Sequence, residues 1–90
     1  MHLTIHGVKV ALTQSAQRDF AELPRVIQAR VLSLLERLER WPDVSGAKSL
    51  TGNLAGRYRL RTGDYRLQFQ VRGESVNVEK IGHRDRFYEE

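Results

Sequence analysis

Basic side chains dominate the chemistry that the second half of this sequence could perform. Twelve of the fifteen basic residues are arginine. Residues 48–72 contain a single acid, Asp64, and six basic residues, which are Lys48, Arg57, Arg59, Arg61, Arg66 and Arg72. A guanidinium group is a flat, permanently charged fork that matches the oxygens of a phosphate. Such a cluster indicates a polyanionic partner, nucleic acid first. The alternative, from charge alone, is a solvated face that only aids solubility.

These arginines are spaced as alternate residues of β-strands. Residues 57–61 read Arg-Tyr-Arg-Leu-Arg, and the alternation resumes over residues 65–72 after a turn at residues 62–64. Because successive side chains of a strand point to opposite faces of its sheet, the apolar residues take one face and the arginines the other. Like charges on neighbouring strands repel each other, so this arrangement is easier to understand if an anion lies across it.

The first half of the sequence predicts two helices. Thr13 suits the N-cap of a helix over residues 14–22, and Pro24 suits the first position of a second helix. The second helix has one apolar stripe and should end near Arg40 or Trp41, because the proline that follows disfavours helix before it. Since the connection is so short, we expect the two helices to form an antiparallel hairpin.

The remaining elements are strands and loops. Alternation predicts an N-terminal strand at residues 8–12, and a last strand begins with Val76 and Val78 and runs to residue 81 or 82. With the two arginine-bearing strands, this gives an α+β fold: an N-terminal strand, a helical hairpin and a three-stranded antiparallel meander in one sheet. The whole chain, residues 1–90, is expected to be a single domain.

Two segments are expected to lack regular structure. Residues 42–56 are rich in Gly, Ser and Asn and predict a loop, which Leu50 and Leu54 should pin to the core. Residues 83–90 predict a polar tail in which Phe87 and Tyr88 are embedded.

Composition excludes several classes of protein. Hydrophobic residues make up 40% and charged residues 29% of the chain, as in globular domains rather than disordered tails. Without cysteine there is neither a disulfide framework nor a thiolate metal site, and we expect no metal and no cofactor. No signal-like or membrane-spanning apolar run is present, so we expect a cytoplasmic protein with no membrane partner.

Two motifs resemble a known family. Residues 50–67, which read Leu-Thr-Gly-Asn-Leu-Ala-Gly-Arg-Tyr-Arg-Leu-Arg-Thr-Gly-Asp-Tyr-Arg-Leu, resemble the central signature of RelE/ParE-superfamily toxins. Residues 81–88, Ile-Gly-His-Arg-Asp-Arg-Phe-Tyr, resemble its closing motif of a glycine, a basic pair and a late tyrosine. The order of elements also matches, so the resemblance covers nearly the whole chain and implies a RelE-like fold of the microbial ribonuclease type.

The resemblance implies the toxin of a type II toxin–antitoxin system. RelE-like toxins are endoribonucleases, known as mRNA interferases, that cleave messenger RNA, commonly in the ribosomal A site. A ribose 2′-OH attacks the adjacent phosphate, and no metal takes part. The partners implied are a cognate antitoxin, messenger RNA and the ribosome, and the toxin–antitoxin complex is expected to bind operator DNA.

The same resemblance assigns roles to individual residues. Arg66 matches the family's phosphate-binding arginine, Arg84 matches a second arginine near the C-terminus, and Tyr88 matches the late tyrosine. Known members carry lysines where this chain has Arg59 and Arg61, and an arginine cannot serve as a base. These two therefore fit RNA binding, together with Lys48 and Arg57.

His83 is the candidate for proton transfer, because an imidazole titrates near neutral pH. The predicted catalytic set is thus Arg66, His83, Arg84 and Tyr88, with the order of acid and base left open between His83 and Tyr88. Two alternatives also remain open: a ParE-like toxin that inhibits DNA gyrase without catalysis, and a silent module that only binds an antitoxin and represses.

Overall fold

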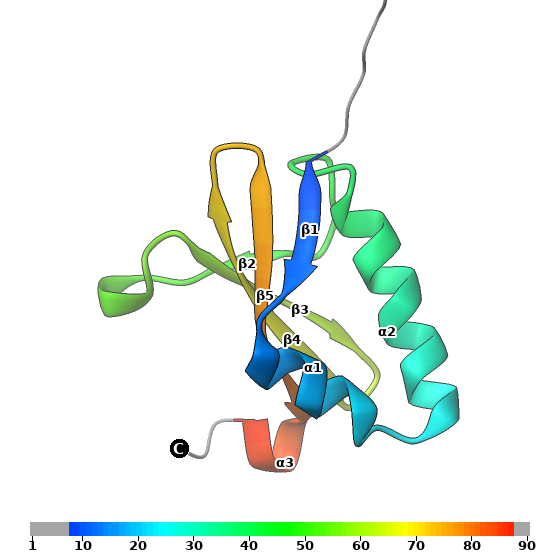
Figure 1. Cartoon of the computed structure of the whole chain (residues 1–90). Coiled ribbons are helices and arrows are strands. Elements are labelled where there is room, and N and C mark those ends of the chain that lie inside the picture. The colour runs from blue at the N-terminus through cyan, green and yellow to red at the C-terminus, as the bar shows by residue number, and fades with distance from the viewer. Residues whose placement is uncertain (1–7, 88–90) are drawn as a thin grey trace, which may run out of the picture.

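The computed structural model describes residues 8–87 and shows two helices packed on one face of a five-stranded mixed sheet (Figure 1). The strand order is β1-β5-β4-β3-β2, so the α+β class and the single sheet are confirmed. The elements in chain order are β1 (Lys9–Leu12), α1 (Gln14–Ala21), α2 (Arg25–Leu38), β2 (Lys48–Ser49), the 3-10 turn η1 (Gly52–Leu54), β3 (Arg57–Thr62), β4 (Tyr65–Arg72), β5 (Ser75–His83) and α3 (Arg84–Phe87).

Two tight hairpins build the predicted meander of β3, β4 and β5. Gly63 and Gly73 open the two-residue turns, with φ of 59° and 55°, while no other residue type in the described chain has a positive φ. A glycine with positive φ at the first turn position, followed by a residue without it, is the type II′ pattern that matches the twist of paired strands. The turn residues therefore set the register of all three strands.

The N-terminal strand leads directly into the first helix. β1 pairs in parallel with β5 from Lys9 opposite Ser75 to Leu12 opposite Val78. The Thr13 side chain then accepts a hydrogen bond from the Ala16 amide at 3.1 Å, as predicted for an N-cap. Because the chain turns into α1 at this point, β1 covers only the first half of β5.

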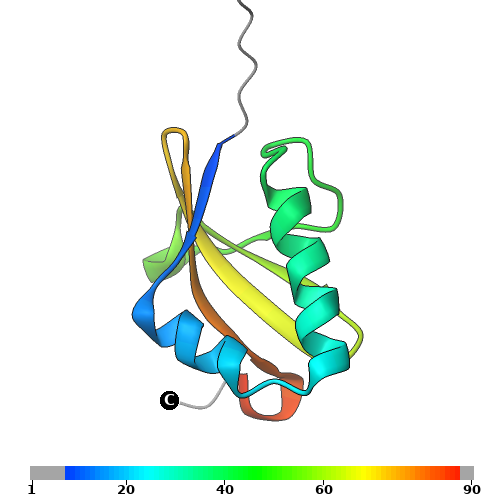
Figure 2. The ribbon, with the colours of Figure 1, turned by 45° about the vertical axis from the view of Figure 1, so that its right-hand side comes forward.

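The two helices share one face of the sheet but diverge at a wide angle, and do not lie side by side as in the predicted hairpin (Figures 1 and 2). α1 packs across the end of β5, whereas α2 runs along the sheet and packs on β3. Their apolar stripes meet different strands, so the short connection brings the helices together only at the turn. None of the described helices is long and apolar enough to cross a membrane.

The core lies between these helices and the meander. Its fully buried residues come from both layers and are Ala16, Val31, Leu34, Leu38, Leu60, Leu67, Phe69, Val76, Val78 and Ile81. Trp41 closes one end, where its ring lies edge-on to those of Tyr58 at 4.6 Å and Phe69 at 5.3 Å. The predicted alternation of β3 and β4 is therefore confirmed: their apolar side chains face the helices.

A β-bulge in β5 changes the alternation of that strand. Phe69 pairs with Val78, but the preceding Gln68 pairs with Lys80, so Glu79 is an extra residue. The bulge keeps both Val78 and Ile81 in the core although they are three positions apart. It therefore leaves two consecutive polar residues outside the core.

Three details differ from the sequence predictions. The loop at residues 42–56 contains the short strand β2 and the turn η1, and Leu54 is 38% exposed instead of pinned to the core. The predicted tail begins with the helix α3, which buries Phe87 against Gly82. The Phe87 ring lies beneath the charged ends of Arg59, at 5.4 Å, and Lys80, at 4.7 Å.

The burial of two leucines predicts opposite outcomes for one substitution. Leu38 is 0% exposed and Leu54 is 38% exposed. Leu38→Ala should lower the free energy of unfolding by about 2–5 kcal/mol, because it removes buried methyl groups and leaves a cavity. Leu54→Ala should change it by about 0.5 kcal/mol or less. Urea denaturation measures both, and equal losses would contradict this assignment of the core.

Candidate functional site

The sheet face opposite the helices carries the basic residues that the sequence singled out. We call Lys48, Arg57, Arg59, Arg61 and Arg66 the arginine face. Paired residues on neighbouring strands share a face: Lys48 pairs with Arg59, and Arg61 pairs with Arg66. Since Leu60 and Leu67 pair in the core between them, the intervening cations must point away from the helices.

Four of these cations surround one hollow, which we call the basic hollow. It has a volume of about 390 Å³ and is lined by Gly46, Lys48, Arg59, Leu60, Arg61 and Arg66. Every charged side chain in this lining is a cation, and Arg61 lies directly opposite Arg66 across the two strands. Like charges placed this way are unfavourable unless an anion neutralises them. The basic hollow is therefore suited to hold a phosphate group.

Arg57 is engaged by an acid. Its Nε donates to the Glu79 carboxylate at 2.8 and 3.1 Å, and the Gln68 amide donates to the same carboxylate at 3.3 Å. The hydrogen bond to Glu79 and the attraction of its charge raise the pKa of Arg57. The bulge in β5 places Glu79 beside Arg57. Arg57 is therefore less available to an outside anion than Lys48 or Arg61 of the basic hollow.

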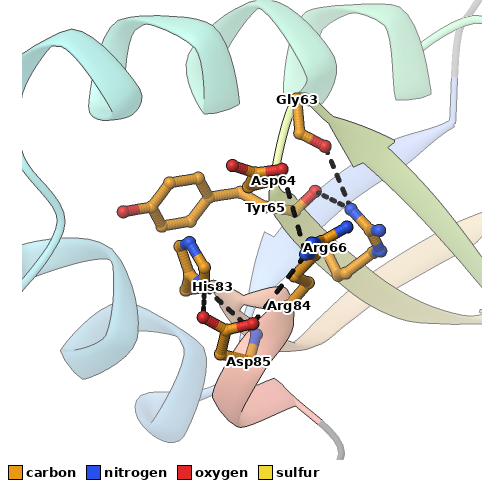
Figure 3. Close-up of polar contacts among 7 residues, drawn as sticks. All are labelled: Gly63, Asp64, Tyr65, Arg66, His83, Arg84 and Asp85. Carbon is orange, nitrogen blue, oxygen red and sulfur yellow. Dashed lines mark hydrogen bonds and ion pairs between the residues drawn. The ribbon is translucent and has the colours of Figure 1, made fainter.

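Arg66 and Arg84 lie at the same end of the sheet (Figure 3). Arg66 is on β4, and Arg84 begins α3, directly after the neighbouring strand β5. Arg66 Nη1 donates to the carbonyls of Gly63 at 3.1 Å and Tyr65 at 3.3 Å. The backbone amide of Arg84 donates to the Asp64 carbonyl at 2.7 Å, which ties the start of α3 to the β3–β4 turn. The turn therefore positions both predicted phosphate-binding arginines.

The Arg84 side chain is only loosely paired. Its Nε lies 4.0 Å from Asp64 Oδ1 and 3.8 Å from Asp85 Oδ1, and all three side chains are more than half exposed. Exposed ion pairs of this length contribute little to stability. Arg84 can therefore exchange these carboxylates for a phosphate at small cost.

His83 points away from Arg66. It pairs with Tyr65, so these two side chains share the face of Leu67 and the helices, whereas Arg66 pairs with Gly82 on the other face. The two rings lie edge to face with centroids 5.1 Å apart (Figure 3). The Asp85 amide donates to His83 Nδ1 at 3.1 Å. The structure thus brings together Arg66 and Arg84 but not His83, while Tyr88 lies outside the described residues.

Glu79 and Gln68 are polar residues among these cations, and of the two only Glu79 was not assigned to this face from the sequence. The Arg59 guanidinium donates to the Gln68 side chain at 3.4 Å, so a hydrogen-bonded chain runs from Arg59 through Gln68 and Glu79 to Arg57. The position of Gln68 follows from simple alternation. The position of Glu79 depends on the bulge, for which the sequence has no clear signal.

The sequence matches the family model described as ParE toxin of type II toxin–antitoxin system, parDE, over residues 10–88. It is also 24% identical over 85 residues to Toxin RelE3 of Methanocaldococcus jannaschii, an alignment that covers 91% of this chain and 97% of the relative.

Solved structures share the fold. The toxin–antitoxin complex RelBE2 of Mycobacterium tuberculosis contains a chain 32% identical to this one, with a TM-score of 0.77, and the match covers 90% of this chain and 95% of that one. The isolated RelE toxin of Escherichia coli is 19% identical with a TM-score of 0.72, covering 84% of this chain and 83% of the other.

The engagement of Arg57 by Glu79 predicts that Glu79→Gln strengthens the binding of anions. This change removes a negative charge from the arginine face and releases Arg57. The affinity for a single-stranded oligonucleotide should rise, and the slope of log affinity against log salt should steepen by about 0.7, the value for one more phosphate contact. Fluorescence anisotropy over a salt series measures both quantities.

Glu74→Gln is the matched control, because Glu74 is exposed in the turn that joins β4 to β5, away from Arg57. An equal change in both variants would mean that only net charge matters and that Arg57 gains no contact.

Proposed function

The chain belongs to the ParE toxin family of type II toxin–antitoxin systems, within the RelE/ParE superfamily, and we propose that it is an endoribonuclease that cleaves messenger RNA without a metal. The observation that carries this proposal is the basic hollow, with Arg66 at its rim and Arg84 at the same end of the sheet. Four converging cations suit the phosphates of RNA and, in the inhibited complex, an acidic segment of the antitoxin.

The arginine face suits single-stranded RNA. Its cations are spread over β2, β3 and β4, so successive phosphates of an extended strand can meet Lys48, Arg59 and Arg61 in turn. Cation contacts to phosphates supply most of the affinity of sequence-independent binding. The face therefore supports RNA as the substrate class and leaves sequence preference to other contacts.

The reaction we propose is an internal transfer. The 2′ oxygen of one nucleotide forms a bond to the adjacent phosphorus, and the bond from that phosphorus to the 5′ oxygen of the next nucleotide breaks. A base takes the proton of the 2′-OH, and an acid supplies a proton to the leaving 5′ oxygen. The products are a 2′,3′-cyclic phosphate and a 5′-OH end, so atoms and charge balance without water or metal.

Arg66 and Arg84 are assigned to the phosphate. Negative charge accumulates on the phosphoryl oxygens as the fifth bond forms, and a fixed cation stabilises that state more than the ground state. The carbonyls of Gly63 and Tyr65 hold the Arg66 guanidinium in place before substrate arrives. The weakly paired Arg84 can then supply the second fork to the same oxygens.

Proton transfer is assigned to His83 and Tyr88. The Asp85 backbone amide donates to His83 Nδ1, so Nε2 is the ring nitrogen that can exchange a proton with the RNA. His83 and Tyr88 together are assigned the roles of base and acid. His83 shares a face with Tyr65, and Arg66 lies on the other face of the sheet.

The biological setting follows from the family. One relative was solved in complex with its antitoxin, so we propose that a cognate antitoxin binds and inhibits this chain, and that the complex binds operator DNA. We further propose that cleavage takes place in the cytoplasm, in the A site of the ribosome.

The mechanism predicts separate losses for three substitutions. Arg66→Ala and Arg84→Ala should each slow single-turnover cleavage of messenger RNA on programmed ribosomes by about 10²–10³-fold, the cost of losing an electrostatic stabiliser. His83→Ala should slow it by about 10²–10⁴-fold if it transfers a proton. Mapping of RNA ends in EDTA measures the rate and identifies the cyclic phosphate.

Arg72→Ala is the matched control, because Arg72 is exposed at the opposite end of the same strand as Arg66. Normal cleavage by Arg66→Ala would show that the site is misplaced. Normal cleavage by His83→Ala alone would keep the site and move proton transfer to another group. Inhibition of DNA gyrase supercoiling with intact messenger RNA would favour the ParE-like alternative.

The arginine face also predicts where the antitoxin binds. The Arg59→Glu, Arg61→Glu double variant should lose at least about tenfold in affinity for the antitoxin, because it reverses two charges that attract an acidic segment. Surface plasmon resonance with the purified antitoxin measures this loss. The control double variant, Arg18→Glu with Arg25→Glu, reverses two exposed charges on α1 and α2. A larger loss in that control would place the antitoxin on the helices.

A further inference from the structure

A second cavity lies at the edge of β5, away from the basic hollow. β1 pairs with β5 only as far as Val78, so the segment from Lys80 to His83 has no strand beside it on that edge. The end of α1 borders this segment on one side and α3 on the other, and together they enclose about 390 Å³. We call this space the edge cavity.

The end of α1 takes the place of the missing strand at one point. Asp19 Oδ2 accepts a hydrogen bond from the Ile81 backbone amide at 3.0 Å, the direction in which a neighbouring strand would pair. This single side chain accepts the hydrogen bond of one backbone amide at the strand edge and leaves the space next to it open. The edge cavity therefore exists because a carboxylate, not a backbone, covers this part of β5.

The lining combines aromatic rings with charges of both signs. Tyr65 and His83 form the aromatic wall, with their rings edge to face, and Leu23 adds an apolar surface. The carboxylates are those of Asp19 on α1 and of Glu22, its C-cap residue, and the cations are Lys80 and Arg86. A flat ring with a polar edge fits such a lining, because its faces pack on the aromatic side chains while its edge meets the charges.

The edge cavity adjoins the proposed phosphate site. Gly82 lines the cavity and is the residue that pairs with Arg66. His83, which also lines it, immediately precedes Arg84. Consecutive Cα atoms are about 3.8 Å apart, so the backbone of Arg84 lies next to the lining of the cavity.

We propose that the edge cavity receives one unstacked nucleobase of the bound RNA and favours a base with an exocyclic amino group. The proposal rests on the proposed function for its substrate class, and it adds a specificity site that lies outside the arginine face. The ligand is the base next to the scissile phosphate, and Tyr65 and His83 provide its aromatic neighbours.

Lys80 and Arg86 also line the cavity and can donate to the O2 carbonyl that cytosine and uracil share, so the choice between these two bases falls to the carboxylates. An amino group of cytosine, adenine or guanine donates hydrogen bonds, and Asp and Glu side chains accept them. Uracil has a carbonyl oxygen where cytosine has its amino group, and two oxygens facing each other repel. Glu22 is exposed and Asp19 uses one oxygen for Ile81, so an acceptor remains available on each side chain.

A titration with single nucleotides tests the proposal directly. The full chain, labelled with ¹⁵N, is titrated with cytidine 3′-monophosphate, uridine 3′-monophosphate and inorganic phosphate. We expect cytidine 3′-monophosphate to shift the backbone amides of Glu22, Ile81 and His83, and to bind about tenfold more tightly than the uridine nucleotide, the factor for one charge-assisted hydrogen bond. Inorganic phosphate should shift residues of the arginine face and Arg84 and leave the amides of Glu22 and Ile81 unshifted.

Glu22→Ala should reduce the preference for cytidine at least about threefold, whereas Glu74→Ala, an exposed glutamate in the β4–β5 turn, should leave it unchanged. Glu22 is exposed at the end of α1, so its loss leaves the core intact. Equal binding of the two nucleotides, or shifts confined to the arginine face, would overturn the base site and leave the proposed ribonuclease standing. Cytidine-selective shifts in a chain that cleaves no RNA would support the site and overturn the ribonuclease.

Discussion

The structure depends on one row of buried side chains across the sheet. Leu60 pairs with Leu67, and Leu67 pairs with Ile81, so three neighbouring strands present apolar groups to the helices at the same level. The next row therefore consists of Arg61, Arg66 and Gly82 and faces the other way. A shift of one strand by a single residue would bury an arginine and expose a leucine, so burial of the first row fixes the charges of the second.

The arginine face is electrostatically unfavourable by itself. Arg61 and Arg66 lie opposite each other, and the basic hollow brings two further cations to the same point. Glu79 relieves part of this repulsion at Arg57, and the Phe87 ring beneath Arg59 and Lys80 offers a cation–π contact. Arg61 and Arg66, which lie directly opposite each other, are relieved by a bound anion, so this face is the natural place for a phosphate.

The end of β5 connects the two sites that we propose. Gly82 pairs with Arg66 and His83 pairs with Tyr65, and both line the edge cavity, while the Arg84 amide and side chain approach Asp64. A nucleotide also has two parts, with its phosphate and its base pointing in different directions. Three consecutive residues could thus read both parts of one nucleotide, and proton transfer by His83 would take place where the two sites meet.

The sequence by itself determined the features that depend on neighbouring residues. The alternation of Arg57 to Arg61 and the glycines at positions 63 and 73 specified the strands, their turns and the arginine face, and Thr13 specified the start of α1. Two motifs were sufficient to indicate the family. In each case the physical cause acts over a few residues: the period of a strand, the φ of a turn, or the cap of a helix.

Only the tertiary structure decided the features that depend on contacts between distant segments. Glu79 reaches Arg57 because a bulge changes the pairing of β4 with β5, and Phe87 is buried because α3 folds back onto Gly82. The helices diverge because they pack on different strands, and the edge cavity exists because β1 ends before β5 does. Each of these outcomes depends on how two segments far apart in the chain pack. Local periodicity carries no information about which distant segments come into contact.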